Sequence, residues 1–205
     1  IRKYDIQDLR RWYRMWYAPN NATLVIAGDV EATAVIAMAK EHFGPLKPST
    51  LEPPKSRKEV KQLGPREVVV RVPAEVPYLL MGFPAPTVVT ATEAWEPYAL
   101  EVLAYVMDGG DSSRMSKRLV RGSQIAASAG VGDDPYDRLQ TLFLLDGVPA
   151  EGHTIAEVKA ALLAQLEEIQ QAPVTQSELD RVKAQVVAGK VFERDSVFYQ
   201  AMQIG

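Results

Sequence analysis

Apolar residues recur every three or four positions in several stretches of the chain, and this spacing predicts amphipathic helices. The first stretch is 5–17, where an apolar stripe from Ile6 to Trp16 is ended by Pro19. The same spacing predicts helices over 31–43, 93–107, 112–121 and 154–170, and a last helix that begins after Thr175 and continues towards Gly205. Helices therefore account for much of the chain.

Short apolar runs rich in β-branched residues predict strands between these helices. The expected strands cover 23–27, 67–72, 78–83, 124–131 and 139–148. Strands thus follow one another in sequence, and helices occur in consecutive pairs. This order favours an α+β fold over a doubly wound parallel sheet.

Prolines mark the main boundary. Five of them, at 45, 48, 53, 54 and 65, lie among Lys, Ser, Glu and Arg, where there is little to bury. Such a segment is stiff and extended, as linkers are. We predict the tail of a first domain at 1–45, a Pro-rich linker at 46–65 and a second domain at 66–205. The chain begins at Ile1 rather than Met, and we expect it to be a piece of a longer protein.

Composition narrows the classes of function. The net charge is −3 and the pI is near 5.5, and no basic stripe suggests a nucleic-acid surface. No apolar run reaches about eighteen residues, so we expect no membrane span. The chain has no cysteine, which excludes disulfides, thiolate zinc sites and cysteine nucleophiles.

Two glycines precede the helix at 112–121. Gly109 and Gly110 allow a tight turn, and Ser112 or Ser113 is expected to cap the helix that follows. Met115 and Leu119 are four residues apart on its predicted buried face, and four cations take the other faces: Arg114, Lys117, Arg118 and Arg121. Backbone N–H groups of the turn could hold an anion, but Asp108 and Asp111 oppose it, so a helix–helix turn is the favoured interpretation.

The strand at 126–130 consists of very small residues, AASAG. Such a strand lets another backbone approach closely. Two interpretations remain open: a wall along which an extended peptide lies, or tight packing of a helix on the sheet.

No catalytic or metal-binding residue is predicted in this chain. An inverted zincin needs H-x-x-E-H, but Met38 stands where the first histidine before Glu41-His42 should be. His153 is far away in sequence, and no serine lies in G-x-S-x-G. We therefore expect no metal or cofactor here.

Several segments, in order, resemble the pitrilysin/insulinase-type zinc peptidases, the inverted zincins. They are YAPNNATLVIAGDV at 17–30, Phe43-Gly44-Pro45, Gly82-Phe83, Gly109–Arg114 and Glu178-Leu179 to Lys183. The resemblance implies a two-layer α+β fold like that of the mitochondrial processing peptidase, with a mainly antiparallel sheet and helices on one face. It also implies that the zinc site lies upstream of Ile1 and that the second domain is a non-catalytic repeat that encloses a peptide substrate.

Members of this family carry an arginine and a tyrosine that are seven positions apart, and this chain lacks both. Laid on 119–127, their positions hold Val120 and Ala127, and Arg121 is one place away. We hypothesise that the parent, the longer protein of which this chain is a piece, is a zinc endopeptidase. A partner subunit would then supply the arginine and the tyrosine. The alternatives are an inactive peptidase-like scaffold and an unrelated α+β binding module.

The resemblance suggests further expectations. Zinc is expected in the parent, and a peptide substrate and a homologous subunit, as a hetero- or homodimer, are the expected partners. The periplasm is the expected location and the cytoplasm the alternative. Residues 5–45 are expected to place strand 23–27 beside 66–72 in the sheet. The candidate substrate-binding residues are Gly109, Gly110, Ser112, Arg114, Ala127 and Ser128.

Overall fold

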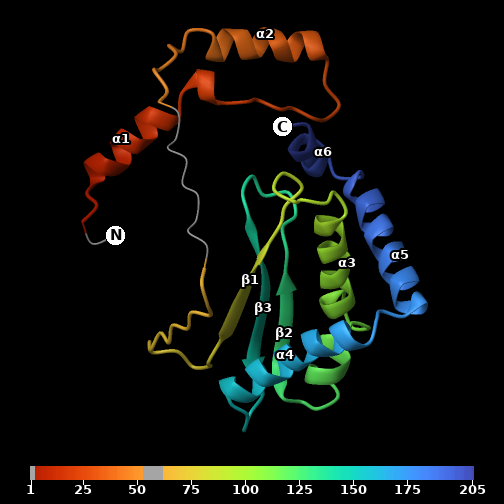
Figure 1. Ribbon diagram of the computed structural model, residues 1–205. Coiled ribbons are helices and arrows are strands. Elements are labelled where there is room, and N and C mark those ends of the chain that lie inside the picture. Colours follow the sequence, from red (N-terminus) through yellow and green to blue (C-terminus); the bar gives the residue numbers. More distant parts are fainter. Residues whose placement is uncertain (1–2, 53–61) are drawn as a thin grey trace. The chain divides into compact units, whose positions relative to one another are not determined.

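The central strand of the sheet is β3 (Thr141–Pro149), which pairs antiparallel with β1 (Leu79–Ala85) on one side and β2 (Ala126–Gly132) on the other. Figure 1 shows this arrangement in the computed structural model, which describes residues 3–52 and 62–205. Residues of β3 alternate between the two faces of the sheet. Phe143 and Leu145 are buried on one face, whereas Leu142 on the other is 48% exposed.

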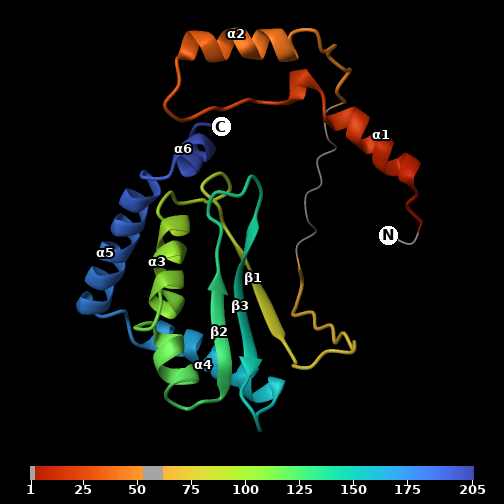
Figure 2. The same cartoon turned by 180° about the vertical axis from the view of Figure 1, so that it is seen from behind.

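Two helices cover the buried face. They are α3 (Glu96–Asp108) and α4 (Ile155–Gln171), whose Met107, Val158 and Leu162 pack against Leu145 and its neighbours. A short helix at 114–120, which includes a π-helical turn at Ser116–Val120, adds Met115 and Leu119 to this core. Figure 2 shows the sheet from the other side, where the strands pass in front of α4. The expected two-layer α+β fold, with helices on one face, is confirmed.

Side-chain caps define where the main helices begin. The carboxylate of Asp5 accepts hydrogen bonds at the start of α1 (Ile6–Trp16). Thr154 with Glu157 forms a capping box at the start of α4, and Thr175 with Glu178 forms one at the start of α5 (Gln176–Glu193). Each box pairs backbone N–H groups that a helix start leaves without partners. The expected helices at 5–17, 31–43, 93–107 and 154–170 are confirmed, the second being α2 (Ala32–Phe43).

Three predictions about secondary structure are wrong. Residues 23–27 and 67–72 form no strand, and the sheet therefore does not pair them. Most of their apolar side chains are exposed, as the 82% exposure of Val68 illustrates, and a β-prone sequence forms a strand only beside a hydrogen-bonding partner. The last helix also breaks, because Ser196 accepts a hydrogen bond from Tyr199 N–H and starts α6 (Val197–Ile204).

The chain divides into two units, one of Ile1–Val68 with Lys190–Gly205 and one of Val69–Gly189. The first holds α1, a 3-10 turn at Pro19–Asn21, α2 and α6. The sheet and its core lie in the second. Residues 53–61 of the predicted linker lie outside the described residues, and the domain limits stay a prediction.

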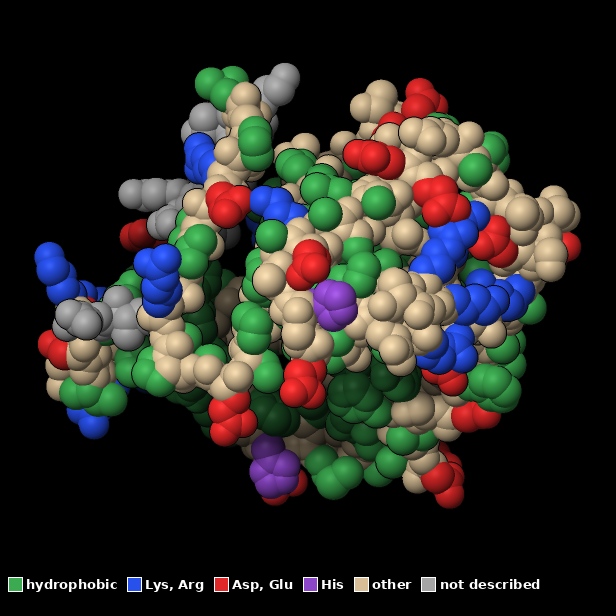
Figure 3. Space-filling model, turned by 90° about the horizontal axis from the view of Figure 1, so that it is seen from below, with side chains coloured by type: hydrophobic (Ala, Val, Ile, Leu, Met, Phe, Trp, Pro, Cys, Tyr) green, Lys and Arg blue, Asp and Glu red, His purple; other side chains and the backbone are tan. Residues whose placement is uncertain are grey.

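Large apolar side chains remain exposed in both units. Figure 3 shows hydrophobic side chains lying between acidic and basic ones on one face. None of the described helices has the length and apolar character that crossing a membrane requires.

Truncation of the Leu145 side chain tests whether the core lies on only one face of the sheet. Because this side chain is fully buried, Leu145→Ala is expected to lower the free energy of unfolding by about 2–5 kcal/mol. Leu142→Ala is the matched control on the opposite, exposed face of β3, and it should cost less than about 1 kcal/mol. Urea denaturation followed by circular dichroism measures both. Equal losses would contradict burial of a single face.

Candidate functional site

The glycine turn closes α3 and leads into the helix at 114–120. Gly109 N–H donates to the carbonyl of Tyr105 at 2.7 Å, and Gly110 has a φ of +87°, which only glycine adopts at little cost. Ser113 N–H donates to the carbonyl of Gly110 at 2.9 Å. Two of the predicted substrate-binding residues therefore shape this turn through their backbone.

Ser113, and not Ser112, caps the following helix. Ser113 is fully buried, and its Oγ accepts from Ser116 N–H at 3.4 Å, whereas Ser112 is exposed. Met115 and Leu119 are buried as predicted. The choice that the sequence left open between the two serines is thus resolved in favour of Ser113.

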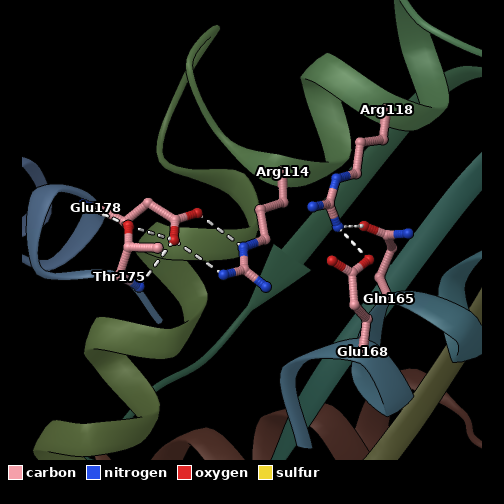
Figure 4. Close-up of polar contacts among 6 residues, drawn as sticks. All are labelled: Arg114, Arg118, Gln165, Glu168, Thr175 and Glu178. Atoms are coloured by element: carbon pink, nitrogen blue, oxygen red, sulfur yellow. Dashed lines mark hydrogen bonds and ion pairs between the residues drawn. The ribbon is translucent and has the colours of Figure 1, made fainter. Parts of the chain in front are cut away.

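Arg114 is buried, which corrects its predicted place among the exposed cations. Only 8% of the residue is exposed, and its guanidinium donates to both carboxylate oxygens of Glu178, from Nε at 2.8 Å and from Nη2 at 2.9 Å (Figure 4). The third nitrogen, Nη1, is buried and has no hydrogen-bond partner. The helical pattern could not show that α5 begins beside this side chain.

Glu178 serves the ion pair and the capping box together. Its Oε2 accepts from Thr175 N–H at 3.0 Å and from the Thr175 hydroxyl at 2.9 Å, besides Arg114. The hydrogen bonds from Arg114 are the main cause that lowers the pKa of Glu178 to about 2. The same pairing raises the pKa of Arg114. This contact joins the glycine-turn helix to α5.

Arg118 of this helix and Arg121 directly after it are also engaged. Arg118 donates to Gln165 at 3.0 Å and to Glu168, both on α4 (Figure 4). Arg121 donates to the carbonyl of Asp111 and so ties the end of the helix back to the glycine turn. Arg121, the arginine one place from the family's position, is therefore part of the local scaffold.

Ala127 and Ser128 lie in β2, at a bulge. Ala126 pairs with Pro149 and Ser128 with Val148, so Ala127 is the extra residue. Ala126 and Ala129 pack against the core, while Ser128 lies on the face of the sheet that α4 does not cover. The small-residue strand thus packs closely on one side and leaves the other side open.

Acidic groups gather near β2. Asp108, the last residue of α3, accepts a hydrogen bond from Val131 N–H at 3.1 Å. Asp108, Glu101 and Asp133 line a pocket of about 240 Å³. Desolvation and the charges of Glu101 and Asp134 raise the pKa of Asp133, whose two carboxylate oxygens are buried without a hydrogen-bond partner. Sequence analysis missed this group because its members are scattered along the chain.

The described residues do not fit a zinc site. Across 3–52 and 62–205 no group of three or more His, Cys, Asp or Glu side chains could hold a metal ion. Nδ1 of His153 instead faces Oε1 of Glu157 at 3.5 Å, within the same helix start. No step of zinc chemistry is therefore derived from these residues.

Comparisons with known proteins give the family. The model of the Peptidase M16 inactive domain matches residues 3–186. The zinc protease PqqE of Helicobacter pylori is 28% identical over 188 residues, which are 89% of this chain and 41% of that protein. The probable zinc protease PqqL of Escherichia coli is 36% identical over 39 residues, 19% of this chain and 4% of that protein.

A solved structure shares the fold. The crystal structure of a protease from Helicobacter pylori matches with a TM-score of 0.87 at 24% identity, over 98% of this chain and 48% of that one. The one-sided α+β sheet thus defines a fold that a bacterial protease also has. The chain belongs to the Peptidase M16 inactive domain family, and the resemblance to zinc peptidases is confirmed. It spans less than half of the PqqE relative and of the solved chain.

The six candidate substrate-binding residues fall into two groups. Gly109, Gly110, Ser112 and Arg114 belong to the turn and the helix start, whereas Ala127 and Ser128 belong to β2. Ser128 is the member that lies on the open face of the sheet. A role in substrate binding stays a prediction for all six.

Glu178→Gln should destabilise the protein strongly. The neutral amide leaves the buried guanidinium of Arg114 without its counter-charge, so we expect a loss of about 3 kcal/mol in the free energy of unfolding. Glu167→Gln, on the exposed side of α4, removes the same charge and should change it by less than about 0.5 kcal/mol. Urea unfolding at pH 7 compares the two. Equal effects would refute a special role for the pair.

The same pair predicts a dependence on pH. The folded pKa of Glu178 is about 2, below the ordinary value of 4.5, so its stabilisation is complete above pH 4.5 and is lost as the pH falls towards 2. The difference in unfolding free energy between wild type and Glu178→Gln should therefore shrink across this range. Urea titrations at several pH values measure it, and a difference that stays constant would contradict the prediction.

Proposed function

We propose that this chain is the non-catalytic half of a zinc-dependent endopeptidase and that it helps to enclose a peptide or an unfolded polypeptide. The observation that carries the proposal is the open face of the sheet, in a chain that belongs to a family of inactive peptidase domains. A surface of small and apolar residues beside β2 suits an extended main chain. The zinc site of the parent would lie outside this chain.

The relatives support the zinc part of the proposal. Both are named zinc proteases, whereas the residues described in this chain offer no set of metal ligands. Val120 and Ala127 stand where the sequence comparison expected the family's arginine and tyrosine, so we also propose that a homologous partner subunit supplies that pair. The competing proposal is that the chain is part of an inactive scaffold. The presence of Val120 and Ala127 in place of the arginine and the tyrosine favours that proposal too.

Zinc content and peptide cleavage of the full-length protein test the proposal. We expect bound zinc by elemental analysis, and cleavage of a quenched fluorescent peptide that falls at least about tenfold when 1,10-phenanthroline removes the metal. The double variant His42→Ala, His153→Ala should keep the wild-type zinc content, because neither histidine belongs to a ligand set in the described residues.

Other results of these zinc and cleavage measurements would support a different function. Zinc without cleavage, with cleavage restored by a homologous subunit, would support the two-chain arrangement. A full-length protein that binds no zinc and cleaves nothing, with or without such a subunit, would favour the scaffold. Loss of zinc in the double histidine variant would show that this chain contributes to the metal site.

A further inference from the structure

One carboxylate lies in the middle of the open sheet face. The register places Asp146 of β3 between Leu80 of β1 and Gly130 of β2. One step along the sheet, Leu144 lies between Gly82 and Gly132 in the same way. Apolar and glycine positions therefore surround a single charge on this face.

The glycines make this face flat. A Cβ atom on Gly130 would come within 2.7 Å of Oδ1 of Asp146, and one on Gly82 within 3.1 Å of Leu142 Cδ1. The side chains of β3 thus extend sideways over the glycines of both neighbouring strands. A shallow surface of this kind accepts an extended chain more readily than a helix, because the backbone can approach closely.

The exposed apolar area on this face is substantial. Leu80 is 57% exposed, and Leu142 is also on the surface. An extended segment laid across the strands would bury both side chains, and each buried apolar side chain favours binding. This accounts for general affinity for a peptide but not for any preference in its sequence.

The charge of Asp146 supplies such a preference. Among the ion pairs of the described residues, none includes Asp146. Two neighbouring groups respond to this charge. Partial desolvation, then the charge of Asp146 and a hydrogen bond to it, raise the pKa of Tyr78. Desolvation and the charge of Asp146 also raise the pKa of Asp108, which a hydrogen bond from Val131 N–H opposes. A cation placed here would relieve repulsion between carboxylates.

We propose that the open sheet face binds an extended peptide whose Lys or Arg side chain is set against Asp146. This specificity rests on the proposed function, since it assumes that a peptide lies on this face. Leu80 and Leu142 contact the aliphatic stem and the flanking residues, and the carboxylate takes the cationic end. Long basic side chains suit such a surface because their stems are apolar.

The test compares two peptides on the full-length protein. They are fluorescent ten-residue peptides that are identical except for one lysine replaced by norleucine, and a chelator prevents cleavage. Fluorescence anisotropy at low salt should give about fivefold tighter binding of the lysine peptide, the upper range for one partly exposed charge pair. Asp146→Asn should abolish that difference, and added salt should reduce it in the wild type.

Two control variants complete the design. Asp137→Asn removes the same charge from an exposed loop of the same unit and should keep the fivefold preference. Leu80→Asn should weaken both peptides equally, because it removes apolar contact and leaves Asp146 in place. A preference that survives in Asp146→Asn, or an equal affinity for the two peptides in wild type, would overturn the specificity while leaving peptide binding intact. Failure of the wild type to bind either peptide would overturn the proposed function as well.

Discussion

The alternation of side chains along β3 is the constraint on which the rest of the sheet unit depends. Odd-numbered positions such as Phe143 and Leu145 face the helices, and even-numbered positions such as Leu144 and Asp146 face away. A shift of one residue would exchange the two faces, which would bury Asp146 and expose Leu145. The core and the open face therefore result from the same register, and neither can change without the other.

The contact between Arg114 and Glu178 has a second architectural role. A capping-box glutamate normally serves its own helix, but this one also holds a guanidinium from the glycine-turn helix. The start of α5 and the position of the turn are thus fixed by one carboxylate. Since Nη1 of Arg114 stays buried without a partner, removing the carboxylate exposes the full cost of that buried charge.

The sequence predicted those features that local chemistry determines. Helical spacing located α1, α3 and α4, and the apolar runs located β1, β2 and β3, because both patterns depend on neighbours in sequence. The strands expected at 23–27 and 67–72 failed, since pairing requires a partner elsewhere in the chain. The burial of Arg114 and the position of Asp146 between Leu80 and Gly130 were equally out of reach, because each depends on contacts between distant segments.

The two edges of the sheet differ in a way that has a consequence for self-association. On the β2 side, the carboxylate of Asp108 already accepts the hydrogen bond from Val131 N–H, whereas β1 is the outermost strand on the other side. A strand from another molecule that pairs with β2 would have to displace the carboxylate of Asp108. Among the described residues, no carboxylate is known to occupy the edge of β1 in this way. Sheet extension between molecules therefore has one preferred direction, and aggregation of this protein would be expected to proceed through β1.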